Sequence, residues 1–224
     1  MPVTVRGRRL GVQRNGFFTS ANTDRIPGGK LWPEAALTWN AMRIAAVRQG
    51  IPAQEFMPAG PNSSARTLAA QWWFWEHQPP PAAYPGTSNH GWGLAVDVKT
   101  RRAAGWLMRN GHRFGWSHDE GARAGEWWHF RYVGASSVQR RRAGRQLRQW
   151  QDYTDTELRW IGEYDRLLQG NRDRDRRRVL RRVMQAQRKR IWRAAQPRSS
   201  GGDGRGWRYR NRRERYRSLL ARTR

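Results

Sequence analysis

The sequence contains no cysteine, only three lysines among its 44 basic residues, and no apolar run long enough to cross a membrane. The absence of cysteine excludes disulfides and thiol chemistry, so packing and bound ions must stabilise the fold. Acidic residues are also scarce, 17 in all, which leaves a formal net charge of +27. The basic first ten residues are not followed by an apolar segment, so we expect no secretory signal peptide. The large positive net charge favours partners that carry negative charge.

The positive charge is unevenly distributed along the chain. Residues 1–136 carry 16 basic and 8 acidic side chains, whereas residues 137–224 carry 28 basic and 9 acidic ones. The change occurs near a short stretch of glycine, alanine and serine that ends the first part. We therefore predict a folded domain over residues 1–136 and a basic extension over residues 137–224.

The basic extension shows helical periodicity. Apolar residues recur at helical spacing on both sides of a break at 169–171, which predicts a helical hairpin over 137–196. A linker over 197–206 and a basic terminal segment over 207–224 follow. We expect the extension to bind an anionic wall polymer or an acidic partner protein; lipid head groups and nucleic acid are the other candidates. The interleaved aromatic residues suit nucleic acid, but no recognised nucleic-acid motif is present, so this partner ranks lower. The alternative is a solvated basic face on a hairpin used in assembly.

The first 136 residues predict a mixture of helices and short strands. Proline and glycine positions indicate helices over 31–50, 67–77 and 100–110. The second of these helices contains Trp72, Trp73 and Trp75. Three tryptophans so close together cannot share one helix face, so we expect at least one in the core, although they could also form a wall of a binding site.

The residues best suited to metal chemistry gather in two short segments, SNHGWGLAVD and EWWH. The first supplies His90 and Asp97, and the second supplies Glu126 and His129. Two imidazole nitrogens and one carboxylate form a typical catalytic zinc set, with one coordination position open for water. A fourth residue, Glu126, is then available to take the proton of that water. A single histidine is more often a surface or core residue, but four such residues in one ordered pattern favour a zinc site.

The spacing within both segments predicts how these side chains are presented. Apolar residues at 94, 96 and 98 indicate a strand that turns Asp97 to its other face, beside the small Ala95. In the second segment, Glu126 and His129 are three residues apart, so a regular strand would send them to opposite faces. We therefore expect Glu126 at a kink or loop end and His129 inside a strand over 128–133. The helix-borne pattern His-Glu-x-x-His is absent from the sequence.

The two segments, S-x-H-x-x-G-x-A-x-D and E-x-W-H, resemble the D-alanyl-D-alanine carboxypeptidases of the VanY kind. These belong to a wider group of zinc peptidases that includes phage L-alanyl-D-glutamate endopeptidases and shares the hedgehog-type fold. The stretches SARTLAAQ (64–71) and HRFGW (112–116) also match in the expected order, so the resemblance covers about residues 22–133. It implies an α+β fold in which a small antiparallel sheet with flanking helices carries the zinc site, here followed by the α-helical basic extension.

The resemblance also implies roles for individual residues. The resemblance implies that His90, Asp97 and His129 are the zinc ligands. It implies that Glu126 is the general base and acid and that Arg66 stabilises the developing oxyanion. Ser88 and Gln71 would contact the peptide substrate.

The function implied is that of a zinc-dependent hydrolase of peptidoglycan stem peptides, either a D,D-carboxypeptidase or an endopeptidase. The preference for arginine over lysine indicates a GC-rich genome. Together with the expected lack of a signal peptide, this favours a bacteriophage of a high-GC bacterium. The protein would act in the virion tail during entry, beside other virion proteins, or in the host cell wall after release at lysis. The alternative is a virion structural, assembly or wall-binding protein in which the peptidase fold is secondary, although the presence of Glu126 argues against it.

Overall fold

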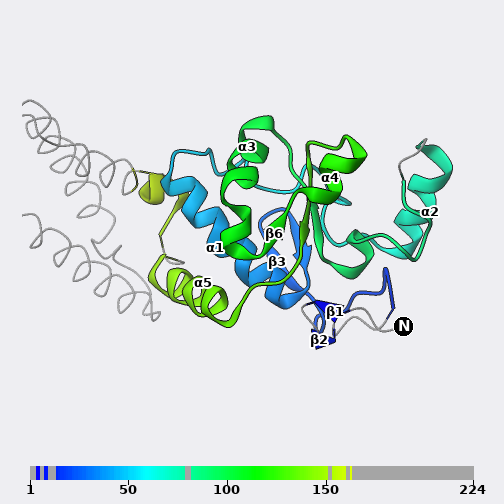
Figure 1. Cartoon of the computed structure of the whole chain (residues 1–224), viewed down its shortest axis with the longest axis horizontal. Coiled ribbons are helices and arrows are strands. Elements are labelled where there is room, and N and C mark those ends of the chain that lie inside the picture. Colours follow the sequence, from blue (N-terminus) through cyan, green and yellow to red (C-terminus); the bar gives the residue numbers. More distant parts are fainter. Residues whose placement is uncertain are drawn as a thin grey trace, which may run out of the picture. The chain divides into compact units, whose positions relative to one another are not determined.

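The computed structural model describes residues 4–5, 8–9, 14–78, 82–150, 153–159 and 162 (Figure 1). The strands are β1 (Thr4–Val5), β2 (Arg8–Arg9), β3 (Asp24–Ile26), β4 (Gly29–Leu31), β5 (Ala95–Asp97), β6 (Trp116–Ser117) and β7 (His129–Tyr132). The α-helices are α1 (Pro33–Arg48), α2 (Leu68–His77), α3 (Arg101–Asn110), α4 (Asp119–Ala124) and α5 (Ser137–Trp150). Two 3-10 turns, η1 (His90–Trp92) and η2 (Gly111–Phe114), lie between these elements. None of the helices in the described part of the chain has the length and apolar character that a bilayer span requires.

The central sheet has three antiparallel strands in the order β5-β7-β6. Two separate hairpins, β1-β2 and β3-β4, lie earlier in the chain. In the central sheet Val96 pairs with Phe130 and Trp116 pairs with Tyr132, and all four side chains are buried. The α+β fold with a small antiparallel sheet and flanking helices, predicted from the sequence, is confirmed.

Helix α1 connects the two groups of buried apolar side chains. It begins with Pro33 in its first turn and ends where Gly50 adopts a left-handed φ of 90°, as the sequence predicts. Its Trp39 packs against Phe56 and Trp116 at ring-centroid distances of 5.1 Å in both cases. This cluster continues into the central sheet. Burial on more than one face explains why α1 lacks a simple apolar stripe.

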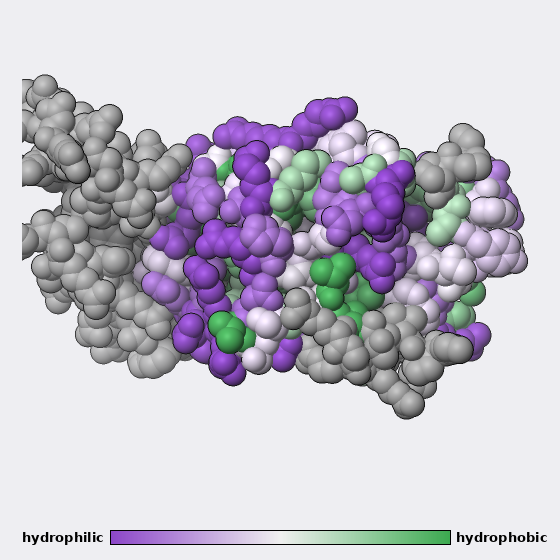
Figure 2. Space-filling view, viewed as in Figure 1, coloured by the Kyte–Doolittle hydropathy of each residue, from purple (hydrophilic) through white to green (hydrophobic). Residues whose placement is uncertain are grey.

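Helix α5, the first part of the basic extension, packs against α1. Trp150 and Leu158 form a second apolar cluster with Ile44 and Val47 of α1. Figure 2 shows hydrophilic residues gathered over the outer side of α5. The change of charge at residue 136 therefore does not coincide with a change of packing, because α5 packs apolar side chains against α1 while most of its arginines are exposed. The contiguous unit that contains these elements runs from Met1 to Glu163.

Polar contacts also join α1 to α5 and to the segment that follows α5. Arg43 of α1 makes a two-pronged ion pair with Asp155, at 2.8 and 2.7 Å, and the Gln146 side chain donates to the carbonyl of Ala41 at 2.7 Å. A helix at the start of the extension is thus present as predicted. The second helix of the predicted hairpin, the linker over 197–206 and the segment over 207–224 lie outside the described residues. The division of the chain into a domain over 1–136 and an extension over 137–224 stays a prediction.

Helix α2 departs from the sequence prediction. The side chains of Trp72, Trp73 and Trp75 are 42%, 51% and 45% exposed, so the expectation that at least one lies in the core is wrong. The helix buries only Gln71, and Trp72 and Trp75 instead set their rings edge-on to the exposed Tyr84, at 5.9 and 5.5 Å. The number of aromatic residues in a helix therefore does not predict whether they are buried. The rings of α2 pack against neighbouring aromatic rings and not in the core around the central sheet.

Candidate metal centre

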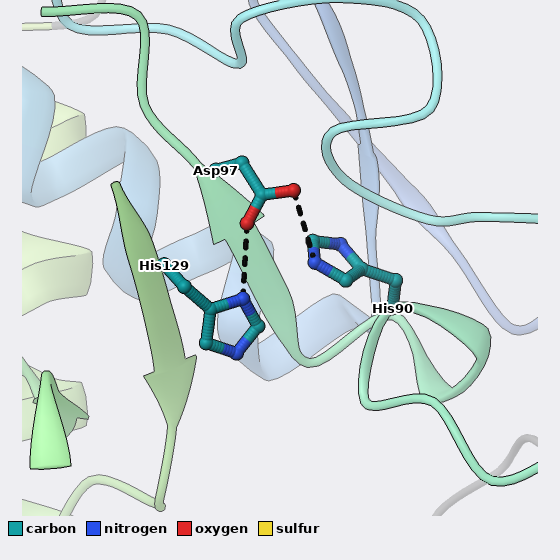
Figure 3. Close-up of side chains that lie close together, drawn as sticks. All are labelled: His90, Asp97 and His129. Carbon is teal, nitrogen blue, oxygen red and sulfur yellow. Dashed lines mark hydrogen bonds and ion pairs between the residues drawn. The ribbon is translucent and has the colours of Figure 1, made fainter. Parts of the chain in front are cut away.

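The structure brings His90, Asp97 and His129 together (Figure 3). The Nε2 atom of His90 lies 3.2 Å from Oδ2 of Asp97, and Nδ1 of His129 lies 2.9 Å from Oδ1 of the same carboxylate. One candidate ligand atom from each residue falls within 4.8 Å of the other two. The three side chains that the sequence pattern singled out therefore converge on one point.

Strand register explains why two of the three side chains meet. Asp97 on β5 and His129 on β7 are direct cross-strand partners. Side chains of paired residues lie on the same face of a sheet, with their Cβ atoms about 4.5–5.5 Å apart. Leu94, Val96 and Val98 are buried, as the predicted alternation requires. The apolar face of β5 thus anchors the strand, and the pairing with β7 sets the distance between the two ligands.

The third side chain, His90, is delivered by the 3-10 turn η1. The turn ends at Gly93, whose φ of 66° is left-handed, and a Cβ there would lie 2.8 Å from the backbone nitrogen of Trp32. The backbone N–H of Trp32 donates to the carbonyl of Gly93 at 3.0 Å. This close approach of the two chain segments requires glycine and fixes where the turn, and hence His90, is placed.

A backbone carbonyl sets the tautomer of His90. Nδ1 lies 2.9 Å from the carbonyl oxygen of Ser64, which can only accept a hydrogen bond. Nδ1 of His90 therefore carries a proton, so in the neutral imidazole Nε2, the atom that faces Asp97, is the nitrogen whose lone pair can bind a metal. Support of this kind is typical of histidines that bind metals.

The charge state of Asp97 also suits a metal ligand. Burial alone would raise the pKa of Asp97, but the attraction of His90 and the hydrogen bonds from His129 and His90 outweigh it and hold the pKa below its usual range. The group therefore offers two nitrogens and an ionised carboxylate in a nearly closed environment. Such a donor set fits a zinc ion with three protein ligands and an open position.

Glu126 lies in the turn between α4 and β7, where the sequence analysis expected a kink or loop end. Its backbone N–H donates to the carbonyl of Gly121 at 2.7 Å, and its own carbonyl accepts from the backbone N–H of His129 at 3.2 Å. Burial, helped by the negative charge of Asp97, raises the pKa of Glu126 against the opposing effect of nearby cationic groups. The half-buried carboxylate is thus near enough to the centre to interact electrostatically with all three candidate ligands.

Arg66 reaches the same centre from the segment before α2. Its guanidinium lies 3.3 Å from Oδ2 of Asp97, donates to the carbonyl of Asn62 at 2.9 Å, and stacks over the ring of Phe74 at 4.3 Å from the centroid. Its backbone N–H donates to the carbonyl of His90 at 3.0 Å. These contacts leave a positive charge in a fixed orientation beside the candidate ligands.

The two predicted peptide contacts, Ser88 and Gln71, are buried. Oγ of Ser88 accepts from the backbone N–H of His90 at 3.3 Å. The Gln71 amide donates to Oδ1 of Asn15 at 2.8 Å and accepts from the backbone N–H of Gly86 at 3.0 Å. In the structure both residues brace the turn that carries His90, and their contact with substrate stays a prediction.

Several supporting residues were missed by sequence reasoning. Asn15 links Gln71 to the carbonyl of Ser88, which it reaches at 2.8 Å. Nε2 of His118 lies 3.1 Å from the carbonyl of Glu126, to which it donates. A Cβ at Gly121 would lie 2.5 and 2.6 Å from the carbonyls of His129 and Glu126. These residues lie outside the four motifs, and only tertiary contacts reveal them.

Comparison with solved structures finds proteins of the kind that the motifs resemble. One is the vancomycin resistance D,D-pentapeptidase VanY of a VanB-type resistance cassette, a mutant solved in complex with Zn(II). It is 22% identical, with a TM-score of 0.38, over 61% of this chain and 88% of that one. Another is VanYB in complex with D-alanine-D-alanine, 23% identical with a TM-score of 0.38, over 57% of this chain and 82% of that one. No protein-family model and no curated protein sequence matches the chain.

Proposed function

We propose that the protein is a zinc-dependent peptidase that hydrolyses the stem peptides of peptidoglycan. The observation that carries the proposal is the convergence of His90, Asp97 and His129 with Glu126 held beside them. The first three residues would hold the zinc ion, and the fourth is a carboxylate outside the ligand group. A site that only stored a metal would have no need of this fourth carboxylate.

The residues divide the chemistry between them. A bound zinc ion would polarise the scissile carbonyl and lower the pKa of bound water to about 7. The carboxylate of Glu126 takes a proton from the attacking water and returns it to the leaving amine nitrogen. The raised pKa of Glu126 brings it closer to neutrality, where a general base and acid works best. Arg66 presents its fixed positive charge to the carbonyl oxygen as negative charge develops there.

Peptidoglycan is proposed as the substrate because four motifs, in order, resemble those of the VanY kind of carboxypeptidase. The resemblance leaves two bonds open, the terminal D-alanyl-D-alanine bond and an internal bond of the stem peptide. A direct test incubates the zinc-loaded protein with peptidoglycan from a high-GC Gram-positive bacterium, with and without a chelator. Release of D-alanine identifies a carboxypeptidase, and new stem-peptide fragments identify an endopeptidase. Absence of both products with zinc-loaded protein would refute the proposal.

The origin and place of action are part of the same proposal. The arginine preference and the basic extension support a bacteriophage protein of a high-GC host that acts from the virion tail or in the host wall after release. The extension would bind an anionic wall polymer, or an acidic or virion partner protein, with nucleic acid a lower-ranked partner. The basic outer face of α5, with Arg141, Arg142 and Arg145 exposed, favours this role and also favours the second candidate, a wall-binding or assembly protein. Binding to walls without hydrolysis by the zinc-loaded protein would favour the second candidate.

A further inference from the structure

We propose that Glu120 is a positioning residue for the metal centre, whose carboxylate accepts the Nε2–H of His129 and thereby keeps Nδ1 of that ring available as the ligand atom. The inference rests on the proposed metal site and extends it to a residue outside the sequence motifs. Glu120 belongs to the first turn of α4, and His129 opens β7.

The first observation is an unpaired buried atom. Nε2 of His129 has no hydrogen-bond partner within the described part of the chain, although the atom is fully buried. The opposite nitrogen, Nδ1, faces Asp97 at 2.9 Å. A buried polar atom without a partner is costly, so an acceptor close to it is expected to be used. When Nδ1 binds a metal, the neutral ring carries its proton on Nε2, and that proton needs an acceptor.

The second observation is the place of the Glu120 carboxylate. Its Oε1 lies 4.0 Å from Nε2 of His129, about 1 Å beyond the usual hydrogen-bond distance. The side chain of Asn89 donates to the same oxygen at 2.6 Å, and Arg131 lies 3.4 Å from the other oxygen. Two neighbours thus hold the carboxylate beside the ring, and the remaining gap to Nε2 is about 1 Å longer than a hydrogen bond.

The contacts of Glu120 also connect the two segments that carry candidate ligands. Asn89 precedes His90 in the chain, and Arg131 follows His129 by two residues. One carboxylate on α4 therefore touches both segments while it faces the unpaired ring nitrogen. Carboxylates that support metal-bound histidines fix the tautomer and ring orientation, and their loss typically weakens metal affinity by about 10–100-fold.

The test measures zinc affinity by competition with a chelator. We expect Glu120→Ala to weaken zinc binding by about 10–100-fold, and Glu120→Gln to fall between wild type and Glu120→Ala because its amide oxygen still accepts. Asp119→Asn, on the same turn of α4, is the matched control and should bind zinc like wild type. Equal zinc affinity of wild type and Glu120→Ala would overturn this inference, whereas a wild-type protein that binds no zinc would overturn the proposed function itself.

An NMR signal distinguishes a hydrogen bond from His129 to Glu120 from a purely structural role of Glu120. In the zinc-loaded wild type, the Nε2–H proton of His129 should give a slowly exchanging signal in ¹⁵N-resolved spectra, and Glu120→Ala should lose it. Asn89→Ala removes one brace but leaves the acceptor, so it should keep the signal and lose less zinc affinity than Glu120→Ala. Persistence of the signal in folded, zinc-loaded Glu120→Ala, or an equal loss of affinity in Asn89→Ala, would contradict the inference.

Discussion

The strand pair β5-β7 and the helix α2 both adjoin the candidate metal centre, but they are built in opposite ways. In the strand pair, backbone pairing sets Asp97 opposite His129, and the apolar face beneath is buried. Helix α2 leaves Trp72, Trp73 and Trp75 exposed and is tied to the centre by the buried Gln71. Regular strand pairing fixes the positions of two candidate ligands from a short sequence pattern, whereas the packing of α2 depends on contacts between segments distant in the sequence.

The largest effect on zinc binding and hydrolysis should follow from removing a candidate ligand on the strand pair β5-β7. We expect His129→Ala to weaken zinc binding by more than the roughly 10–100-fold typical of a supporting residue, and to abolish hydrolysis. Metal analysis of the purified protein, together with the peptidoglycan assay, measures both. Full zinc content in His129→Ala would show that this histidine is not a ligand.

Glu126→Ala should separate chemistry from metal binding. The variant should keep its zinc and its fold but lose about 10²–10⁴-fold in hydrolysis, because it removes the proton carrier alone. The control is Glu76→Ala, an exposed carboxylate on α2, which should leave hydrolysis unchanged. If Glu126→Ala lost zinc as fully as His129→Ala, Glu126 would be a ligand and the assigned roles would be wrong.

The packing of the basic extension predicts different results for two truncations. Removal of residues 137–224 strips Trp150 and Leu158 from α1, and each buried side chain is worth about 1.5–3 kcal/mol. Removal of residues 164–224 keeps these contacts, so this chain should be the more stable of the two. Thermal and urea unfolding of both truncated chains measures the difference. Equal stability of the two would mean that α5 contributes nothing to the fold of the first unit.

Tryptophan substitutions sharpen the contrast between buried and exposed aromatic residues. Trp39→Ala, in the core, should cost about 3–5 kcal/mol of unfolding free energy. Trp73→Ala, on the open surface of α2, should change it by no more than about 0.5 kcal/mol. Urea unfolding compares the two variants, and a large cost for Trp73→Ala would show that α2 is packed more tightly than its exposure indicates.

The parts of the fold that the sequence predicted are those with local causes. Helix starts at Pro33 and after Thr67 and Thr100, the alternation around Asp97 and the break at Glu126 all follow from backbone preferences and side-chain periodicity. The convergence of the three candidate ligands could be predicted because they lie in two compact motifs.

The remaining features depend on contacts between distant segments. The composition of the extension indicated a change of domain at 136, but the inner face of α5 is apolar and rests on α1. The contacts of Asn15 and His118 around the centre, and the role proposed for Glu120, involve side chains that meet only after folding. Neither the charge distribution nor the periodicity of the sequence predicts such contacts between distant side chains.

Anomalous X-ray scattering at the zinc edge, measured on crystals of the zinc-loaded protein, tests the proposed metal centre directly. We predict a single peak bound by His90 Nε2, His129 Nδ1 and an Asp97 oxygen, at about 2.0–2.2 Å from each. Glu126 should lie outside the coordination sphere, with Glu120 hydrogen-bonded to the other nitrogen of His129. A peak elsewhere, or one that includes Glu126 and lacks either histidine, would contradict the central claim.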